Sequence, residues 1–139
     1  MTKKELSQLY YLNREIERDK ERLDRLRMLA SSPSGPNLTG MPSGSSFDSR
    51  IERLCAEIID LEAIISAKVT QCVHERNRLE RYIADIPDSF IRQIFQLRFV
   101  NGLNWQQVAA SIGNNTADSV RMACNRYIAK TNAEENAEK

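Results

Sequence analysis

The chain has 139 residues, of which 41% are hydrophobic and 28% charged, and it contains only five glycines and four prolines. This balance is typical of a helical protein with a packed core, and it excludes a generally disordered chain. The formal net charge is +1, so the chain lacks the overall basic excess of many nucleic-acid-binding proteins, and no segment reaches the ~20 apolar residues that cross a bilayer.

The first predicted element is a helix over residues 3–30. Its apolar residues recur in alternating steps of three and four, which is the a/d spacing of a heptad seam. Asp19 is the charged exception on this seam. The seam positions are Leu9, Leu12, Ile16, Asp19, Leu23, Leu26 and Ala30.

A flexible loop is predicted over residues 31–47. Twelve of the sixteen residues from Ser31 to Ser46 are Ser, Pro or Gly, and none is charged. Three prolines and three glycines oppose a continuing helix. The loop is long enough for the chain to double back, since packed helices lie only ~8–10 Å apart.

A second helix is predicted from about residue 48 to residue 85. Its seam shows the same steps and contains Ile51, Leu54, Ile58, Leu61, Ile65, Lys68, Cys72, Glu75, Leu79, Tyr82 and Ile86. We therefore expect residues 1–86 to form a long antiparallel helical hairpin, similar to a coiled coil. Because two helices bury little surface, we also expect a homodimer formed through this hairpin.

Three charged residues interrupt the predicted seams: Asp19, Lys68 and Glu75. Polar groups at such positions often set register or oligomeric state at a cost in stability. Asp19→Leu is then expected to raise the melting temperature, unless Asp19 faces solvent or has a partner.

Residues 87–130 form a second predicted domain, made of three short helices. Pro87 ends the long helix, and Asp88 or Ser89 caps a helix that runs from Ser89 to Val100. Asn101-Gly102 is a helix-stop signal. Asn104 caps the next helix, with Gln107 at the position of a capping-box partner.

The pattern after Asn104 predicts a helix-turn-helix, which makes the whole chain all-α. Two helices that cross steeply need a small residue at their contact and a turn that admits a positive φ. Ala109 and Gly113 meet these two needs. The residues expected to face inward are Val108 and Ile112 from the first helix and Val120 and Ala123 from the second, completed by the face that includes Phe90, Ile91, Ile94, Phe95, Leu97 and Val100 and by Leu103, Trp105, Tyr127 and Ile128.

The helix capped by Thr116 is the candidate recognition helix. Its first amides suit a phosphate, and a recognition helix inserts its N-terminal half in the major groove of double-stranded DNA. There Arg121 can pair with guanine, whereas Asp118 can accept from cytosine or simply favour the helix dipole. The predicted DNA-binding residues are Asn114, Asn115, Thr116, Asp118, Ser119, Arg121, Met122, Asn125 and Arg126.

Charge is distributed unevenly along the last third of the chain. Residues 87–130 contain five basic and two acidic residues, a net charge of +3, whereas residues 131–139 contain three acidic residues and one basic residue, a net charge of −2. We predict a disordered acidic tail over 131–139. This tail would screen the basic domain from non-specific DNA.

The segment "LRFVNGLNWQQVAASIG" followed by "SVRMACNRYIAK" resembles the helix-turn-helix in region four of bacterial sigma factors. The turn "NNTADS" is one residue longer than the common version, so two registers of base contact remain open. The positions that match the family pattern are Gly102, Leu103, Asn104, Trp105, Gln107, Val108, Ala109, Ile112, Gly113, Val120 and Arg121.

The complete layout of helix, Ser/Gly/Pro loop, long helix, "IPD" and helix-turn-helix resembles the small phage and prophage transcriptional regulators of the ArpU and RinA type. This resemblance implies an activator of late or packaging genes that acts with host RNA polymerase. Nothing in the chain matches the sigma-factor segments that bind the −10 element or melt DNA. Two alternatives remain: a small terminase-like packaging subunit that recognises DNA, and a polymerase-binding protein that does not read DNA.

No enzymatic activity, cofactor, metal or small-molecule substrate is predicted. The single histidine, His74, lies two residues from Cys72, and residues at this spacing point to different sides of a helix. Cys55, Cys72 and Cys124 cannot all pair, and no Cys-x-x-Cys motif suggests zinc. Free thiols and a charged N-terminal segment without a signal-peptide pattern predict a cytoplasmic protein.

Overall fold

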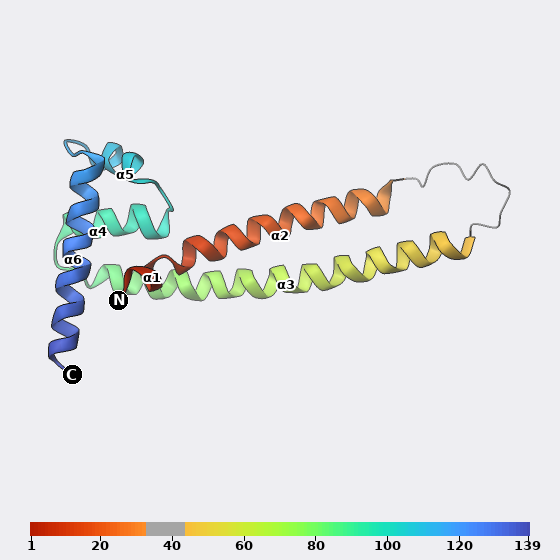
Figure 1. The fold of residues 1–139 in the computed structure, drawn as a ribbon, viewed down its shortest axis with the longest axis horizontal. Coiled ribbons are helices and arrows are strands. Elements are labelled where there is room, and N and C mark those ends of the chain that lie inside the picture. The colour runs from red at the N-terminus through yellow and green to blue at the C-terminus, as the bar shows by residue number, and fades with distance from the viewer. Residues whose placement is uncertain (33–43) are drawn as a thin grey trace. The chain divides into compact units, whose positions relative to one another are not determined.

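The computed structural model describes residues 1–32 and 44–139, and these residues confirm the all-α prediction (Figure 1). Within these two ranges the secondary structure is helical, with no strand. None of the described helices combines the length and apolar character needed to cross a membrane. The helices are α1 (Lys3–Leu6), α2 (Gln8–Ser31), α3 (Gly44–Ala84), α4 (Ser89–Phe95), the π-helix η1 (Gln96–Val100), α5 (Trp105–Ile112) and α6 (Ala117–Ala137).

The chain divides into two compact units. Residues 14–70 form the two-helix unit, and residues 1–13 together with 71–139 form the terminal unit. This division differs from the expected boundary at residue 86. The reason is that Leu6 and Leu9 belong to the same buried cluster as Leu79 and Phe95.

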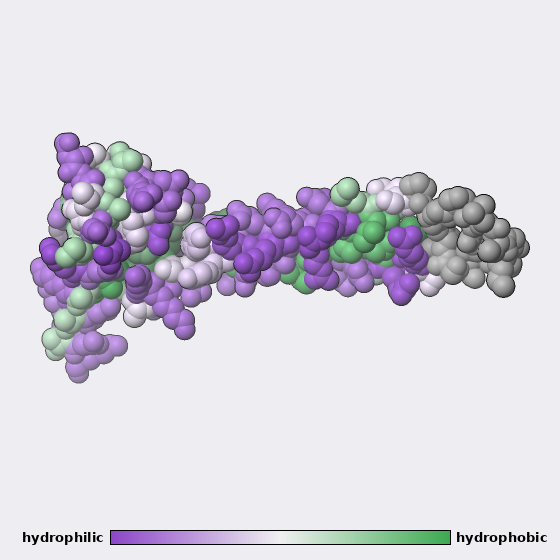
Figure 2. Space-filling model, turned by 45° about the horizontal axis from the view of Figure 1, so that its top comes forward, coloured by the Kyte–Doolittle hydropathy of each residue, from purple (hydrophilic) through white to green (hydrophobic). Residues whose placement is uncertain are grey.

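In the two-helix unit, α2 and α3 run antiparallel. Leu23, Leu26, Leu61 and Ile65 form its buried cluster. Elsewhere the surfaces of these helices are largely hydrophilic, with hydrophobic interruptions (Figure 2). Among the residues of this unit whose burial is described, the exposed large apolar ones are Met28, Leu29, Ile59, Ile64 and Val69.

Three ion pairs join α2 and α3 in this antiparallel register, since Lys68 pairs with Asp19 and also lies 3.9 Å from Glu15, and Arg27 pairs with Glu62. Lys68 Nζ lies 2.6 Å from Asp19 Oδ2, and Arg27 Nη2 lies 2.9 Å from Glu62 Oε1. The hydrogen bond with Asp19 raises the pKa of Lys68 above 10.5. Asp19 therefore has a partner, which removes the basis for expecting that Asp19→Leu alone stabilises the protein.

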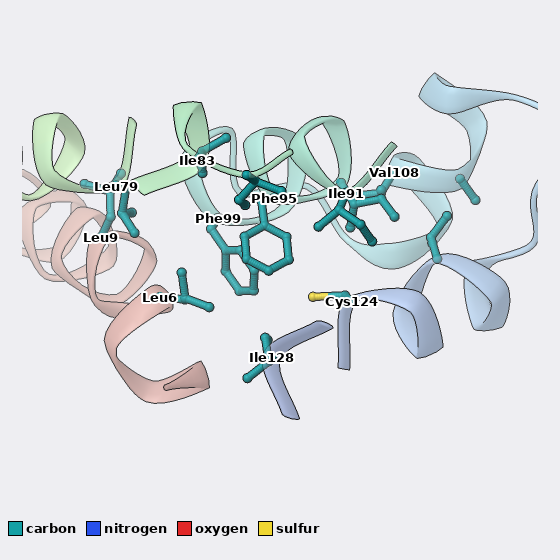
Figure 3. Packing of buried hydrophobic residues seen from close by; sticks show 14 residues of the cluster. Leu6, Leu9, Leu79, Ile83, Ile91, Phe95, Phe99, Val108, Cys124 and Ile128 are labelled. Atoms are coloured by element: carbon teal, nitrogen blue, oxygen red, sulfur yellow. The ribbon is translucent and has the colours of Figure 1, made fainter. Parts of the chain in front are cut away.

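Aromatic rings fill the centre of the terminal unit (Figure 3). Phe95 is fully buried, and its ring centroid lies 5.2 Å from that of Phe99 and 5.5 Å from that of Tyr127, both in edge-on geometry. Tyr82 of α3 stacks on Phe95 at 6.3 Å. Edge-on and offset arrangements are the favourable ones for aromatic pairs. Phe95 thus joins α3, η1 and α6.

Phe99 is buried within the π-helix η1, although the sequence analysis did not single it out. In η1 the N–H of Asn101 donates to the carbonyl of Gln96 at 3.0 Å, a bond that spans five residues. Phe99 lies four residues after Phe95, a spacing that places both side chains on the same side of a helix. Leu97 and Val100, expected on this buried face, are only half-buried.

Three predicted boundaries are wrong. The first helix is interrupted at Ser7, whose N–H and hydroxyl both donate to the carbonyl of Lys3, at 3.1 and 2.9 Å. Both ends of the predicted loop over 31–47 are helical, because α2 includes Ser31 and α3 begins at Gly44. The rest of that prediction, residues 33–43, lies outside the described residues.

The predicted disordered tail is also wrong, since α6 continues to Ala137. The alanines and glutamates of this segment are strong helix formers. Ile128 anchors the helix in the core, and the Thr131 hydroxyl donates to the carbonyl of Tyr127 at 2.8 Å. The acidic residues of the tail therefore lie along a helix or just after its end.

Candidate nucleic-acid interface

A sharp turn separates α5 from α6. Gly113 has φ +80° and ψ 156°, and its N–H donates to the carbonyl of Ala109 at 2.9 Å. Asn114 follows with φ +55°, a left-handed conformation that Asn tolerates better than most residues. The positive φ predicted for Gly113 is confirmed, and the turn uses two such residues in succession.

Side-chain hydrogen bonds stabilise the turn and the start of α6. Asn115 Nδ2 donates to the carbonyl of Gly113 at 2.9 Å, and the Ser119 hydroxyl donates to Asn115 Oδ1 at 3.3 Å. Thr116 Oγ1 accepts from the Ser119 N–H at 3.1 Å, as predicted for the cap. The side chains of Asn115, Thr116 and Ser119 are therefore engaged in stabilising the start of α6.

Small buried side chains allow α5 and α6 to pack closely. Val108 and Ala109 of α5 and Val120 of α6 are buried, as the sequence predicts. On α6, Cys124 occupies the deep position expected for Ala123, which is only half-buried. The predicted capping box of α5 is present: Asn104 Oδ1 accepts from the Gln107 N–H at 2.8 Å, and Gln107 Oε1 accepts from the Asn104 N–H at 3.0 Å.

The outer face of α6 is centred on Met122. Val120 and Cys124 mark its buried face, and because successive residues are about 100° apart, the opposite side passes through Met122. Met122 is 46% exposed. Around it lie exposed Asp118 and Arg126 and half-buried Asn125, one turn before or after.

Arg121 lies on the flank of this face. Its Nη2 atom is 3.3 Å from Asp118 Oδ1 on the same helix, and both side chains are well exposed. Such a pair contributes little to stability in water. Either group can exchange this contact for a ligand at little cost.

Two of the five basic residues counted in residues 87–130 donate to backbone carbonyls. Arg92 Nη1 donates to the carbonyl of Ile86 at 2.7 Å. Arg98 Nη1 donates to the carbonyl of Leu103 at 2.9 Å, and its guanidinium lies 4.7 Å from the centre of the Trp105 ring. No local sequence pattern indicated these roles. The remaining three, Arg121, Arg126 and Lys130, are all exposed on α6.

Cys124 is buried and Tyr82 is half-buried in the core of the terminal unit. Burial raises the pKa of the Cys124 thiol to about 12 and that of the Tyr82 hydroxyl to about 12. His74 is exposed on α3. Among the described residues, no group of three or more His, Cys, Asp or Glu side chains is arranged to hold a metal ion.

A shallow cavity of about 330 Å³ lies elsewhere in the terminal unit. Exposed Tyr10 and Tyr11 contribute to its wall, and their rings meet edge-on at 5.5 Å. Gly102, with φ +71°, lies close to Tyr10. The lining residues are Ser7, Tyr10, Tyr11, Arg98, Phe99, Gly102 and Asn104.

The chain matches no protein-family model, and neither the curated proteins nor the solved structures compared with it show significant similarity. What α6 contacts must therefore be inferred from its own residues and their geometry.

Proposed function

We propose that the protein is a sequence-specific DNA-binding transcription regulator, in which a helical hairpin carries a C-terminal helix-turn-helix. The observation that supports this most strongly is the α5–turn–α6 arrangement. Gly113 and Asn114 turn the chain with positive φ, Thr116 caps α6, and Val108 and Val120 are fully buried where the two helices meet. Two short helices joined by a tight turn support the proposal, because a helix-turn-helix uses such a pair to present its second helix to the major groove.

The residue types on the outer face of α6 suit base recognition. Arg126 and Arg121 can donate to guanine or to phosphate, and Asn125 can pair with adenine. Met122, at the centre of this face, offers an apolar surface for a thymine methyl group. Asn114 and the first amides of α6 lie where a phosphate oxygen can accept hydrogen bonds.

The proposed biological role is a phage or prophage activator of late or packaging genes, with host RNA polymerase as a second partner. It requires no catalytic group or cofactor. The three exposed basic residues of α6 lie within residues 121–130, a segment without an acidic residue, although α6 as a whole contains equal numbers of basic and acidic residues and the chain has a net charge of only +1. Local charge of this kind attracts the phosphate backbone without binding all nucleic acid tightly.

The proposal is tested by selecting bound duplexes from a random pool at fixed salt, using wild type, Arg121→Ala and Arg126→Ala in parallel. Arg81→Ala serves as the matched control, because Arg81 is an exposed arginine on α3. We expect wild type and Arg81→Ala to enrich the same motif. At least one α6 variant should lose discrimination at one base position, at a cost of about 1–3 kcal/mol.

A protein-binding role without DNA reading is the second candidate, and the cavity beside Tyr10 and Tyr11 favours it. Tyrosines combine a large apolar surface with a polar group and are enriched in protein interfaces. Under this alternative no motif is enriched, and Arg121→Ala and Arg126→Ala leave function intact. Tyr11→Ala abolishes it instead.

A further inference from the structure

A second stripe of residues runs along α3, beside the seam that contacts α2. Each of its members follows a seam residue by one position, so the stripe lies about 100° around the helix. All its members are exposed, including Ile59 at 64% and Val73 at 53%. This outer stripe consists of Glu52, Cys55, Ile59, Glu62, Ser66, Val69, Val73 and Arg76.

The outer stripe is symmetric about residue 64. Its steps are three, four, three, four, three, four and three, which read the same in both directions. If a second copy of α3 lies antiparallel with its centre at the same residue, Ile59 faces Val69 and Cys55 faces Val73. These pairs are the a-to-d layers of a heptad repeat, and in a two-fold dimer each contact occurs twice.

Charge selects the antiparallel direction over the parallel one. An antiparallel pair places Glu52 of one copy opposite Arg76 of the other, and Glu62 opposite Ser66. A parallel pair places each of these charges against its own copy, which is unfavourable. Glu62 is also paired with Arg27 at 2.9 Å, which neutralises the carboxylate nearest the centre.

Small residues border the stripe on one side. Ala56, Ala63 and Thr70 occupy this edge, and they let two helix backbones approach closely, because interaxial distance depends on the side chains at the contact. On the other edge lie Ile58 and Ile65 of the inner seam. From Glu52 to Arg76 the stripe measures about 36 Å along the helix.

We infer that the outer stripe of α3 binds the same stripe of a second copy of this chain, in an antiparallel homodimer centred on residue 64. The inference assigns a surface to the homodimer that the sequence predicts through the hairpin, and it rests on the proposed function only in that a regulator of this kind can bind DNA as a dimer. Its test uses no DNA, so a failure of DNA reading and a failure of dimerisation are distinguishable.

The direct test is disulfide cross-linking of the full chain. In a Cys72→Ala background, Val73→Cys should form a covalent dimer under mild oxidation, because each new thiol faces Cys55 of the other copy. The background protein should not cross-link, since its two Cys55 thiols lie about 27 Å apart along the helix. Ile64→Cys is the control, at an exposed position on another face of α3.

A second measurement covers the case in which the cysteine variant perturbs the helix. Ile59→Asp should raise the dissociation constant of the dimer on the order of tenfold or more, whereas Ile64→Asp should not. Light scattering at a series of protein concentrations measures both constants. A monomeric wild type, a Cys55–Cys55 link in the background protein, or equal effects of the two Asp variants would overturn the inference.

Discussion

The two units bury their apolar residues in different ways. In the terminal unit, residues from several helices surround Phe95, and Leu6, Leu79 and Val108 lose all contact with solvent. In the two-helix unit, the buried cluster has four members, each of which keeps a few per cent of its surface exposed. Two helices cannot enclose a side chain on all sides. The terminal unit is therefore expected to be the more stable of the two, and the two-helix unit to depend more on ion pairs and on a partner.

The difference between the two units should have its largest effect on the alkylation rates of the three free thiols. Cys124 is buried in the terminal unit with its pKa raised to about 12, whereas Cys55 is exposed in the two-helix unit. Because the thiolate is the reactive form, Cys124 should be alkylated at least about a thousandfold more slowly than Cys55, through opening of the core. Cys72 is half-buried and should be intermediate. Peptide mapping after timed alkylation measures all three rates, and comparable rates for Cys55 and Cys124 would contradict the described core.

Truncating a core side chain should cost more in the terminal unit than in the two-helix unit. Phe95→Ala removes a fully buried ring that contacts three others, and we expect a loss of about 3–5 kcal/mol in the free energy of unfolding. Leu61→Ala, in the thinner seam, should lie near the lower end of about 2–5 kcal/mol. Urea unfolding followed by circular dichroism measures both, and a larger loss for Leu61→Ala would reverse the comparison.

The turn between α5 and α6 should be sensitive to its backbone conformation alone. Gly113 has φ +80° and ψ 156°, and no atom lies within 4 Å of an added Cβ. Gly113→Ala should therefore destabilise the terminal unit by about 1–3 kcal/mol through backbone strain. Asn114→Gly, which keeps the left-handed φ accessible, is the matched control and should change stability much less. Equal melting temperatures for the two variants would show that the turn is not strained by a side chain at residue 113.

The Asp19–Lys68 pair gives the smallest expected effect. Asp19→Leu leaves Lys68 without its nearest partner and should lower stability by about 1 kcal/mol, whereas Asp19→Leu combined with Lys68→Leu should be neutral or stabilising. Because the pKa of Lys68 is raised, the contribution of the pair is fully present below pH 10.5 and is lost as pH rises through the raised value. A double-mutant cycle in thermal unfolding measures the coupling, and a stabilising single Asp19→Leu would contradict it.

Local patterns in the sequence predicted the helices, their caps and the inner seam correctly. Asn104 with Gln107, Thr116 and Gly113 all act within a few residues of the chain, so their roles are visible without the fold. Burial also follows the 3–4 spacing: every predicted seam residue from Leu9 to Ala30 is buried or half-buried.

The sequence did not reveal contacts that depend on how the helices pack or on irregular backbone. Lys68 as the partner of Asp19 depends on the register of two helices, and the burial of Cys124 depends on how α6 is rotated against α5. The structural roles of Arg92 and Arg98 depend on carbonyl groups five or six residues away in an irregular segment. Charge counting along the sequence therefore overstated the number of exposed basic residues, because Arg92 and Arg98 are half-buried.

The most direct test of DNA reading by α6 is a nuclear magnetic resonance titration of the nitrogen-15-labelled full chain with duplex DNA, preferably the duplex enriched in the selection. We expect the largest changes in amide chemical shift in residues 114–126 and only small changes in residues 14–70. Unchanged α6 signals at saturating duplex, or changes confined to Tyr10, Tyr11 and the other cavity residues, would contradict the proposed recognition helix.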